Sequence, residues 1–152
     1  QTGHVTFEQI RPSLCEGELF EHADGTLYCL FRNSSTPYDG YLWQAQSYDG
    51  GRNWTMPVRS DFSDNNTKSF FCALPDGRYL YIGTPDNTRQ GTRYPLVLAL
   101  SEDGYTRQYE GRWKSGDYGY PFAYIREGWI YVIVSRQKER MDALKCKISD
   151  LR

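Results

Sequence analysis

The sequence predicts an all-β protein built from about three small antiparallel sheets. An acidic residue followed by glycine, and then by a run of aromatic and β-branched residues, recurs at intervals of roughly fifty residues. The turns are Asp24-Gly25, Asp76-Gly77 and Glu127-Gly128. Such a pattern is typical of a hairpin turn that leads into a strand. Helical periodicity is weak everywhere, and we expect at most one helical turn, between Arg136 and Leu144.

Each repeat is expected to contain a second strand after the first. The segments that begin at the three turns are 24–32, 76–83 and 127–136, and the second strands are expected at 41–47, 96–101 and 143–149. The approximate repeats are therefore 13–60, 61–113 and 114–152. We expect each to form one four-stranded blade of a β-propeller, because such sheets cover their apolar faces by stacking on neighbouring blades.

The composition argues against two classes of partner. The formal net charge is −1 and no basic block is present, so a nucleic-acid partner is not expected. No apolar run is long enough to span a membrane. The chain begins at Gln1 and shows no signal peptide, as a mature or shortened chain would, and we expect a secreted or periplasmic location.

The four cysteines do not indicate a metal site. None forms a CxxC pair, so zinc is not expected, and no other metal or cofactor is predicted. Cys29, Cys72 and Cys146 fall in apolar strand patterns and are expected to be buried free thiols, since cysteine packs as a small hydrophobic residue. A Cys15–Cys29 disulfide is the alternative.

Residues 47–54 read S-x-D-x-G-x-x-W. Asp49 is expected to accept hydrogen bonds from turn N–H groups, and Trp54 to pack between neighbouring sheets. This stretch resembles the Asp-box, the repeated hairpin of sialidases and related β-propellers, where the turn is structural and lies away from the catalytic face. A degenerate copy begins at Ser101, with Tyr109 or Trp113 as its aromatic residue.

The order Glu16, Arg32, Arg93, Tyr120 resembles that of the C-terminal half of exo-α-sialidases. The resemblance implies that Arg32 and Arg93 bind the substrate carboxylate, that Tyr120 is the nucleophile and that Glu16 is its base. Arginine suits a carboxylate because its planar fork forms bidentate hydrogen bonds. A neutral tyrosine avoids the repulsion that a carboxylate nucleophile would meet beside an anionic sugar.

Each of these residues has a rival or a structural alternative. Glu18, Arg89 and Tyr118 compete with Glu16, Arg93 and Tyr120, and an arginine at a strand end often pairs with a nearby acid. The aromatic cluster Tyr118, Tyr120, Phe122 and Tyr124 is expected to belong mainly to the blade core, and His4 and His22 are expected at the surface.

Three blades are half of the six in a sialidase propeller. The resemblance places the first triad arginine and the general-acid aspartate in the N-terminal half, and Arg11-Pro12 matches the arginine motif only faintly. We therefore expect a portion of a sialidase-like glycoside hydrolase that binds or cleaves terminal acidic sugars once further blades, from a longer chain or from other copies, complete it. An isolated chain is expected to be inactive. The alternatives are a propeller polysaccharide lyase acting on uronates, or a non-catalytic carbohydrate-binding or assembly module.

Overall fold

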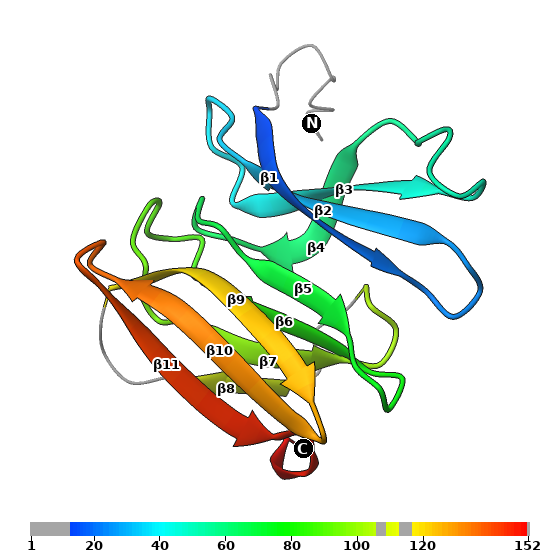
Figure 1. The fold of residues 1–152 in the computed structure, drawn as a ribbon. Helices are drawn as coiled ribbons and strands as arrows, with labels where there is room; N and C mark the ends of the chain where they lie inside the picture. The colour runs from blue at the N-terminus through cyan, green and yellow to red at the C-terminus, as the bar shows by residue number, and fades with distance from the viewer. Residues whose placement is uncertain (1–12, 106–108, 113–116, 152) are drawn as a thin grey trace.

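The computed structural model describes residues 13–105, 109–112 and 117–151, which form three antiparallel sheets (Figure 1). The first sheet contains β1 (Leu14–Glu21), β2 (Leu27–Asn33), β3 (Tyr41–Ser47) and β4 (Val58–Ser63). The second contains β5 (Phe70–Ala73), β6 (Tyr79–Gly83), β7 (Val97–Ser101) and β8 (Tyr109–Arg112). The third contains β9 (Tyr118–Arg126), β10 (Trp129–Arg136) and β11 (Arg140–Lys147), and a 3₁₀ turn, η1 (Ile148–Asp150), follows it.

The predicted all-β architecture of three antiparallel blades is confirmed, with local differences. The boundary expected between residues 60 and 61 falls inside β4. The third sheet has three strands among the described residues rather than four. The segment between Arg136 and Leu144 makes the tight turn from β10 to β11, where Gln137 and Lys138 have φ values of 53° and 60°, and not a helical turn.

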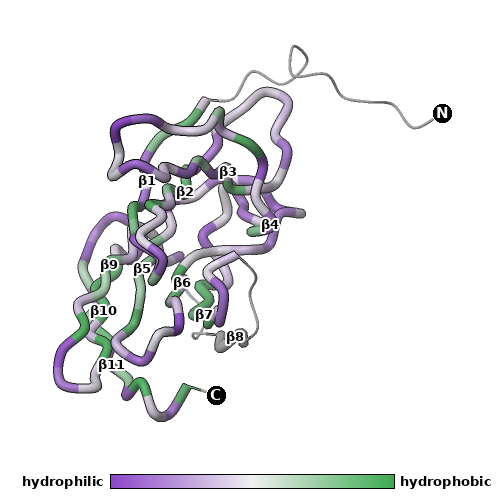
Figure 2. Tube along the Cα trace, turned by 90° about the vertical axis from the view of Figure 1, so that its right-hand side faces the viewer, coloured by the Kyte–Doolittle hydropathy of each residue, from purple (hydrophilic) through white to green (hydrophobic). Residues whose placement is uncertain are grey.

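The middle sheet is buried on both faces because side chains alternate along its strands. In β6, Tyr79 and Tyr81 join the core shared with the first sheet, whereas Leu80 and Ile82 join the core shared with the third. The alternation repeats in β7. Figure 2 shows hydrophobic residues concentrated along β6, β7 and β10, whereas the turns are mainly hydrophilic. The middle sheet is therefore a blade with a neighbour on each side.

The third sheet has one buried and one exposed face. Ala123 and Val132 point toward the second sheet and are buried. The opposite face presents Phe122, Tyr124 and Ile133, which are 56%, 58% and 45% exposed. The expectation that this aromatic cluster is blade core is therefore wrong for its outward members. Of the four, Tyr118 packs against the buried core, and the edge of the exposed Phe122 ring contacts Phe70 of β5.

The connections of the first sheet lie at two opposite rims. The β1–β2 register places Cys15 opposite Arg32 at one end and Glu21 opposite Leu27 at the other. β3 ends at Ser47, which also lies opposite Leu27. The turn after Glu21 and the Asp-box therefore share one rim, called here the turn rim. Arg32 lies at the other, called here the site rim.

All four cysteines lie in the described part of the chain and are free thiols. Cys15 is exposed, whereas Cys29, Cys72 and Cys146 are half-buried rather than fully buried. No Cys15–Cys29 disulfide forms, because Cys29 lies opposite Leu19 in the β1–β2 register. Burial raises the pKa of the Cys29 and Cys72 thiols to about 11, so both stay protonated at neutral pH.

Candidate active site

Two of the four predicted site residues lie on β-bulges in the first strands of their sheets. In β1, Glu16 and Gly17 together oppose a single residue of β2. In β9, Tyr120 and Pro121 together oppose a single residue of β10. A bulge turns a side chain away from the regular alternation of the strand, and bulges are common beside active sites. The same device thus directs Glu16 and Tyr120.

Both residues have a left-handed backbone. The φ angle is 50° at Glu16 and 52° at Tyr120. A residue with a Cβ atom loses about 1–2 kcal/mol in this region, and glycine is the usual occupant of such a bulge position. The fold therefore keeps two of the predicted site residues where glycine would be more stable, and strained backbone of this kind clusters at ligand sites.

Arg32, at the site-rim end of β2, is held by two side chains. Its Nη1 donates to Glu16 Oε2 at 3.0 Å, and its Nε donates to Asn66 Oδ1 at 2.9 Å. Burial alone lowers the pKa of Arg32. The hydrogen bond and charge of Glu16 outweigh this effect and raise the pKa, with further contributions from Cys15 and Tyr120. Arg32 is thus a fixed, half-buried cation.

Arg93 lies in the loop between β6 and β7 and covers Tyr120. Its Cζ atom is 5.0 Å from the centroid of the Tyr120 ring, within cation–π range. Gly119 makes room for this contact, because a Cβ atom there would lie 2.5 Å from Arg93 Nη1. The backbone N–H of Tyr118 donates to the Arg93 carbonyl at 3.2 Å, which ties the loop to β9. The Tyr120 ring remains 45% exposed.

The structure brings the four predicted residues together. Glu16 is paired with Arg32, and Arg93 lies over Tyr120. The two pairs are neighbours, since Tyr120 lies close enough to Arg32 to contribute to the raised pKa of that guanidinium. The result is an acid, two guanidinium groups and a half-exposed phenol, drawn from all three sheets.

The rivals of these residues have other contacts. Glu18 forms an ion pair with Lys68. Arg89 is exposed, and its carbonyl accepts a hydrogen bond within its own loop. Tyr118 packs against the core and lies 5.8 Å from the Cζ atom of Arg136. These three rivals therefore make contacts outside the Glu16–Arg32 and Arg93–Tyr120 pairs.

Sequence reasoning missed residues 64–67, between β4 and β5, which we call the polar connector. Asp64 and Asn65 are fully buried, and Asp64 Oδ2 accepts the backbone N–H groups of Asn66 at 2.8 Å and Thr67 at 3.1 Å. Burial raises the pKa of Asp64 to about 7, although these N–H groups act in the opposite direction. Four consecutive short polar residues are typical of an exposed loop, so only the tertiary fold reveals this segment.

The two Asp-boxes have matching hydrogen bonds. Ser47 Oγ donates to Asp49 Oδ1 at 2.9 Å, and the Asn53 N–H donates to the same carboxylate at 2.9 Å. In the degenerate copy, Ser101 Oγ donates to Asp103 Oδ1, also at 2.9 Å. The predicted role of Asp49 as an acceptor of turn N–H groups is confirmed. The second copy keeps the hydrogen bond between its serine and aspartate side chains, called here the Asp-box lock, and its sequence departs from the motif after Asp103.

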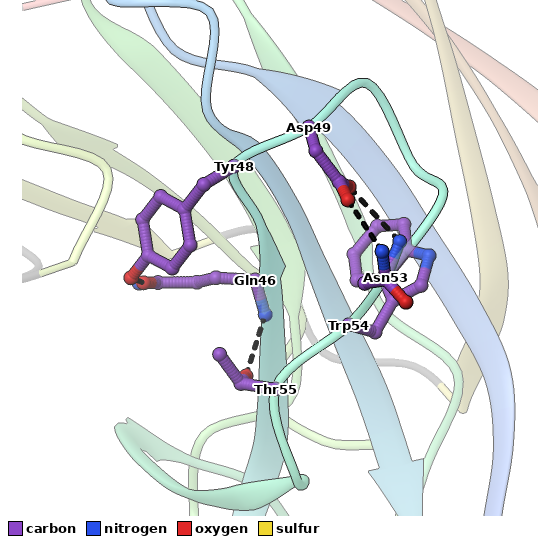
Figure 3. Close-up of a pocket in the computed structure, with 6 residues that line it drawn as sticks. All are labelled: Gln46, Tyr48, Asp49, Asn53, Trp54 and Thr55. Carbon is purple, nitrogen blue, oxygen red and sulfur yellow. Dashed lines mark hydrogen bonds between the residues drawn. The ribbon is translucent and has the colours of Figure 1, made fainter.

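A shallow hollow lies beside the first Asp-box, at the turn rim (Figure 3). Trp54 borders it with a side chain that is 41% exposed and whose Nε1 donates to the Gly51 carbonyl at 3.1 Å. The expectation that Trp54 packs between sheets is wrong, because the ring folds back on its own turn. Asn53 Nδ2 donates to Asp49 Oδ2 at 2.6 Å, so the polar groups of the hollow bond to one another. We interpret it as part of the turn.

His22 also differs from expectation, since it is buried with 9% exposure. Its Nδ1 lies 2.9 Å from the Tyr79 hydroxyl, and its ring stacks on Tyr105. Burial lowers the pKa of His22, against the smaller opposing effect of nearby aspartates. The side chains of Tyr109 and Trp113, as well as Arg11 and His4, lie outside the described residues.

Among the described residues, no group of three or more His, Cys, Asp or Glu side chains is placed to hold a metal ion. In the same part of the chain, no helix has the length and hydropathy of a membrane span.

The three sheets and the Asp-box locks define part of an Asp-box β-propeller. The chain belongs to the BNR repeat-like domain family, whose profile matches residues 2–132. The predicted membership of the sialidase-type Asp-box superfamily is thereby confirmed. No curated protein sequence matches the chain.

Solved propellers of glycosidases have a similar fold. The Hadza microbial sialidase Hz136 has a TM-score of 0.77 at 19% identity, over 93% of this chain and 29% of that one. The intramolecular trans-sialidase of Ruminococcus gnavus, in complex with oseltamivir carboxylate, has a TM-score of 0.69 at 17% identity, over 91% of this chain and 33% of that one. The GH93 α-L-arabinofuranosidase of Fusarium graminearum, in complex with arabinobiose, has a TM-score of 0.65 at 18% identity, over 87% of this chain and 44% of that one. The chain thus spans less than half of each structure, and these identities establish the fold alone.

Proposed function

We propose that this chain is the part of a sialidase-like glycoside hydrolase that binds the carboxylate of a terminal acidic sugar and supplies its nucleophile. The observation that carries the proposal is the pair of contacts Glu16–Arg32 and Arg93–Tyr120, with Tyr120 close enough to Arg32 to affect its pKa. Two cations beside a half-exposed phenol complement the charge of an anionic sugar, whereas the arabinose units bound by some relatives carry no charge.

The proposed roles follow from the chemistry of each group. Arg32 and Arg93 bind the carboxylate, and the Nη2 group of Arg32 has no hydrogen-bond partner among the described residues. Tyr120 Oη attacks the anomeric carbon as Glu16 takes the phenolic proton. The glycosidic bond breaks, and a general acid protonates the departing oxygen. Water then attacks the tyrosyl intermediate, which retains the anomeric configuration.

The general acid and a further arginine are proposed to come from additional blades. The outward face of the third sheet supports this, because Phe122, Tyr124 and Ile133 form an exposed apolar surface like those buried between the other sheets. Leu19, on the far side of the first sheet, is also 58% exposed. Large exposed apolar patches mark interfaces. The expected occupants are further blades of a longer chain, or a second copy. A secreted or periplasmic location remains a prediction.

A binding experiment tests the carboxylate site without requiring turnover. N-acetylneuraminic acid is titrated into the 152-residue chain and followed through the arginine side-chain NMR signals, with neutral N-acetylmannosamine as the control sugar. Arg32→Lys is expected to weaken binding about tenfold, since lysine cannot reproduce the bidentate fork. Arg89→Lys is the matched control and should bind normally. Equal responses to the acidic and neutral sugars would contradict the proposal.

Activity assays on a complete propeller distinguish the enzyme classes. Release from a fluorogenic sialoside supports the hydrolase. Growth of ultraviolet absorbance on a uronic-acid polymer, from an unsaturated product, would instead support a lyase that uses Tyr120 as its acid or base. Sugar binding without turnover in either assay would support a non-catalytic module.

A further inference from the structure

We propose that the polar connector positions both carboxylate-binding arginines, with Asn66 orienting Arg32 and Asn65 holding the loop that carries Arg93. The proposal rests on the proposed function for the use of the two cations, but the positioning itself is a separate physical claim. It assigns a role to a buried segment that neither touches the sugar nor belongs to a strand.

Asn66 orients the guanidinium of Arg32 from the side. Asn66 Oδ1 accepts from Arg32 Nε at 2.9 Å and from Ser34 Oγ at 2.9 Å. Glu16 occupies one N–H of Nη1. Because Nε and one Nη1 hydrogen are engaged on the protein side, the Nη1–Nη2 end of the fork is directed toward a ligand. Without Asn66, the planar guanidinium could swing about its Cγ–Cδ and Cδ–Nε bonds while keeping its charge.

Asp64 holds Asn66 in a conformation that its backbone would otherwise avoid. Asn66 has a φ of 67°, in the left-handed region that asparagine tolerates better than most residues. Asp64 Oδ2 accepts the N–H groups of Asn66 and Thr67 and closes the turn. Asp64 is itself fixed, since its backbone N–H donates to the Gly40 carbonyl at 2.9 Å. The conformation of the turn is therefore fixed by hydrogen bonds that do not involve Arg32.

Asn65 faces the other arginine loop. Its backbone carbonyl accepts from the Gly91 N–H at 2.5 Å, and its Oδ1 accepts from Thr84 Oγ1 at 2.7 Å. Its Nδ2 donates to the carbonyl of Thr92, the residue before Arg93. Asn65 and Asn66 are adjacent in sequence, so one rigid turn sets where the two guanidinium groups lie relative to each other.

A purely structural role is the competing explanation, because buried polar residues often bond to one another simply to satisfy their groups. The two explanations differ in one observable. If Asn66 positions Arg32, its removal frees the Arg32 Nε–H while the fold and the Arg93 loop remain intact. A merely structural Asn66 would alter stability and leave the Arg32 Nε–H protected whenever the protein is folded.

The test follows the solvent exchange of the arginine Nε–H groups by NMR in the 152-residue chain, with Arg32→Lys used to assign the Arg32 signal. Asn66→Gly keeps the left-handed backbone and removes the acceptor. We expect exchange of the Arg32 Nε–H to become about tenfold faster, as for the loss of one hydrogen bond to a charged group. The Arg93 signal should not change, because Asn65 holds its loop. Affinity for N-acetylneuraminic acid should fall about tenfold.

Two further variants sharpen the result. Asn66→Asp restores an acceptor and should return exchange to the wild-type rate or below it. Ser34→Ala removes the other donor to Asn66 Oδ1 and should leave the Arg32 signal protected. Unchanged exchange in a folded Asn66→Gly protein overturns the proposal. If Asn66→Gly does not fold, faster exchange in Asn66→Asp than in wild type overturns it. Absence of sugar binding by the wild type would refute the proposed function, while the exchange rates would still decide the positioning role.

Discussion

Replacement of Asp64 by asparagine should remove a specific pH dependence from the stability of this protein. Asp64 is fully buried, and burial raises its pKa from 3.8 to about 7. Between pH 3.8 and about pH 7, Asp64 therefore keeps its proton in the folded state, whereas it has lost that proton in the unfolded state. Stability from this group is fully present below the unfolded pKa and is lost as the pH rises through the folded pKa.

The magnitude follows from the size of the shift. A difference of roughly three pKa units at 1.36 kcal/mol each corresponds to about 4 kcal/mol as an upper limit. Asparagine resembles the protonated carboxyl group in shape, and its Oδ1 can accept the two backbone N–H groups that Asp64 Oδ2 accepts. The variant and the wild type should therefore differ little near pH 4. By pH 8.5 the variant should have become the more stable by up to that amount.

Urea unfolding followed by tryptophan fluorescence at several pH values measures this difference. The difference between the two free energies of unfolding cancels the contribution of all other titrating groups, provided that both proteins have the same dependence of that free energy on urea concentration. A difference in the free energy of unfolding that stays constant between pH 4 and pH 8.5 would show that Asp64 does not retain its proton in the folded state. The reasoning about burial would then be wrong.

Two further predictions concern other positions. Gly119→Ala should displace the Arg93 guanidinium, because the new Cβ atom would lie 2.5 Å from its Nη1. We expect weaker binding of N-acetylneuraminic acid with an almost unchanged melting temperature, and equal affinity would contradict the close approach. His22→Phe should reduce the loss of stability on acidification, because burial lowers the pKa of His22 and its stabilising effect is lost as the pH falls below about 6.5. Thermal unfolding at pH 5 and pH 7.5 measures this, with Tyr79→Phe as a control that removes only the hydrogen bond to the ring. The same acid sensitivity in both the variant and the wild type would refute it.

Local signals predicted most of the fold. The acidic-glycine turns and the runs after them indicated where strands begin, and β3 has the predicted bounds 41–47. The Asp-box geometry was also predictable, since a serine and an aspartate two residues apart can lock a turn with their own side chains. These features depend on contacts between residues close in sequence.

The errors concern contacts between sheets. Residue type predicts core for Trp54 and Phe122 and surface for His22, yet their burial depends on tertiary packing. Phe122 is 56% exposed because, apart from a ring contact with Phe70, it lies on the outward face of the third sheet. His22 is buried because Tyr79 and Tyr105, from the next sheet, enclose it.

The sequence by itself determined the strand pattern, the Asp-box turns and the chain order of the four proposed site residues, because each of these is set by neighbours along the chain. Only the tertiary structure decided that Glu16, Arg32, Arg93 and Tyr120 meet at one rim. Sheet stacking joins residues that are far apart in sequence, and paired bulges in β1 and β9 redirect two of these side chains. The polar connector became visible only there, since its hydrogen bonds reach β2 and the β6–β7 loop across three-dimensional contacts that no local pattern encodes.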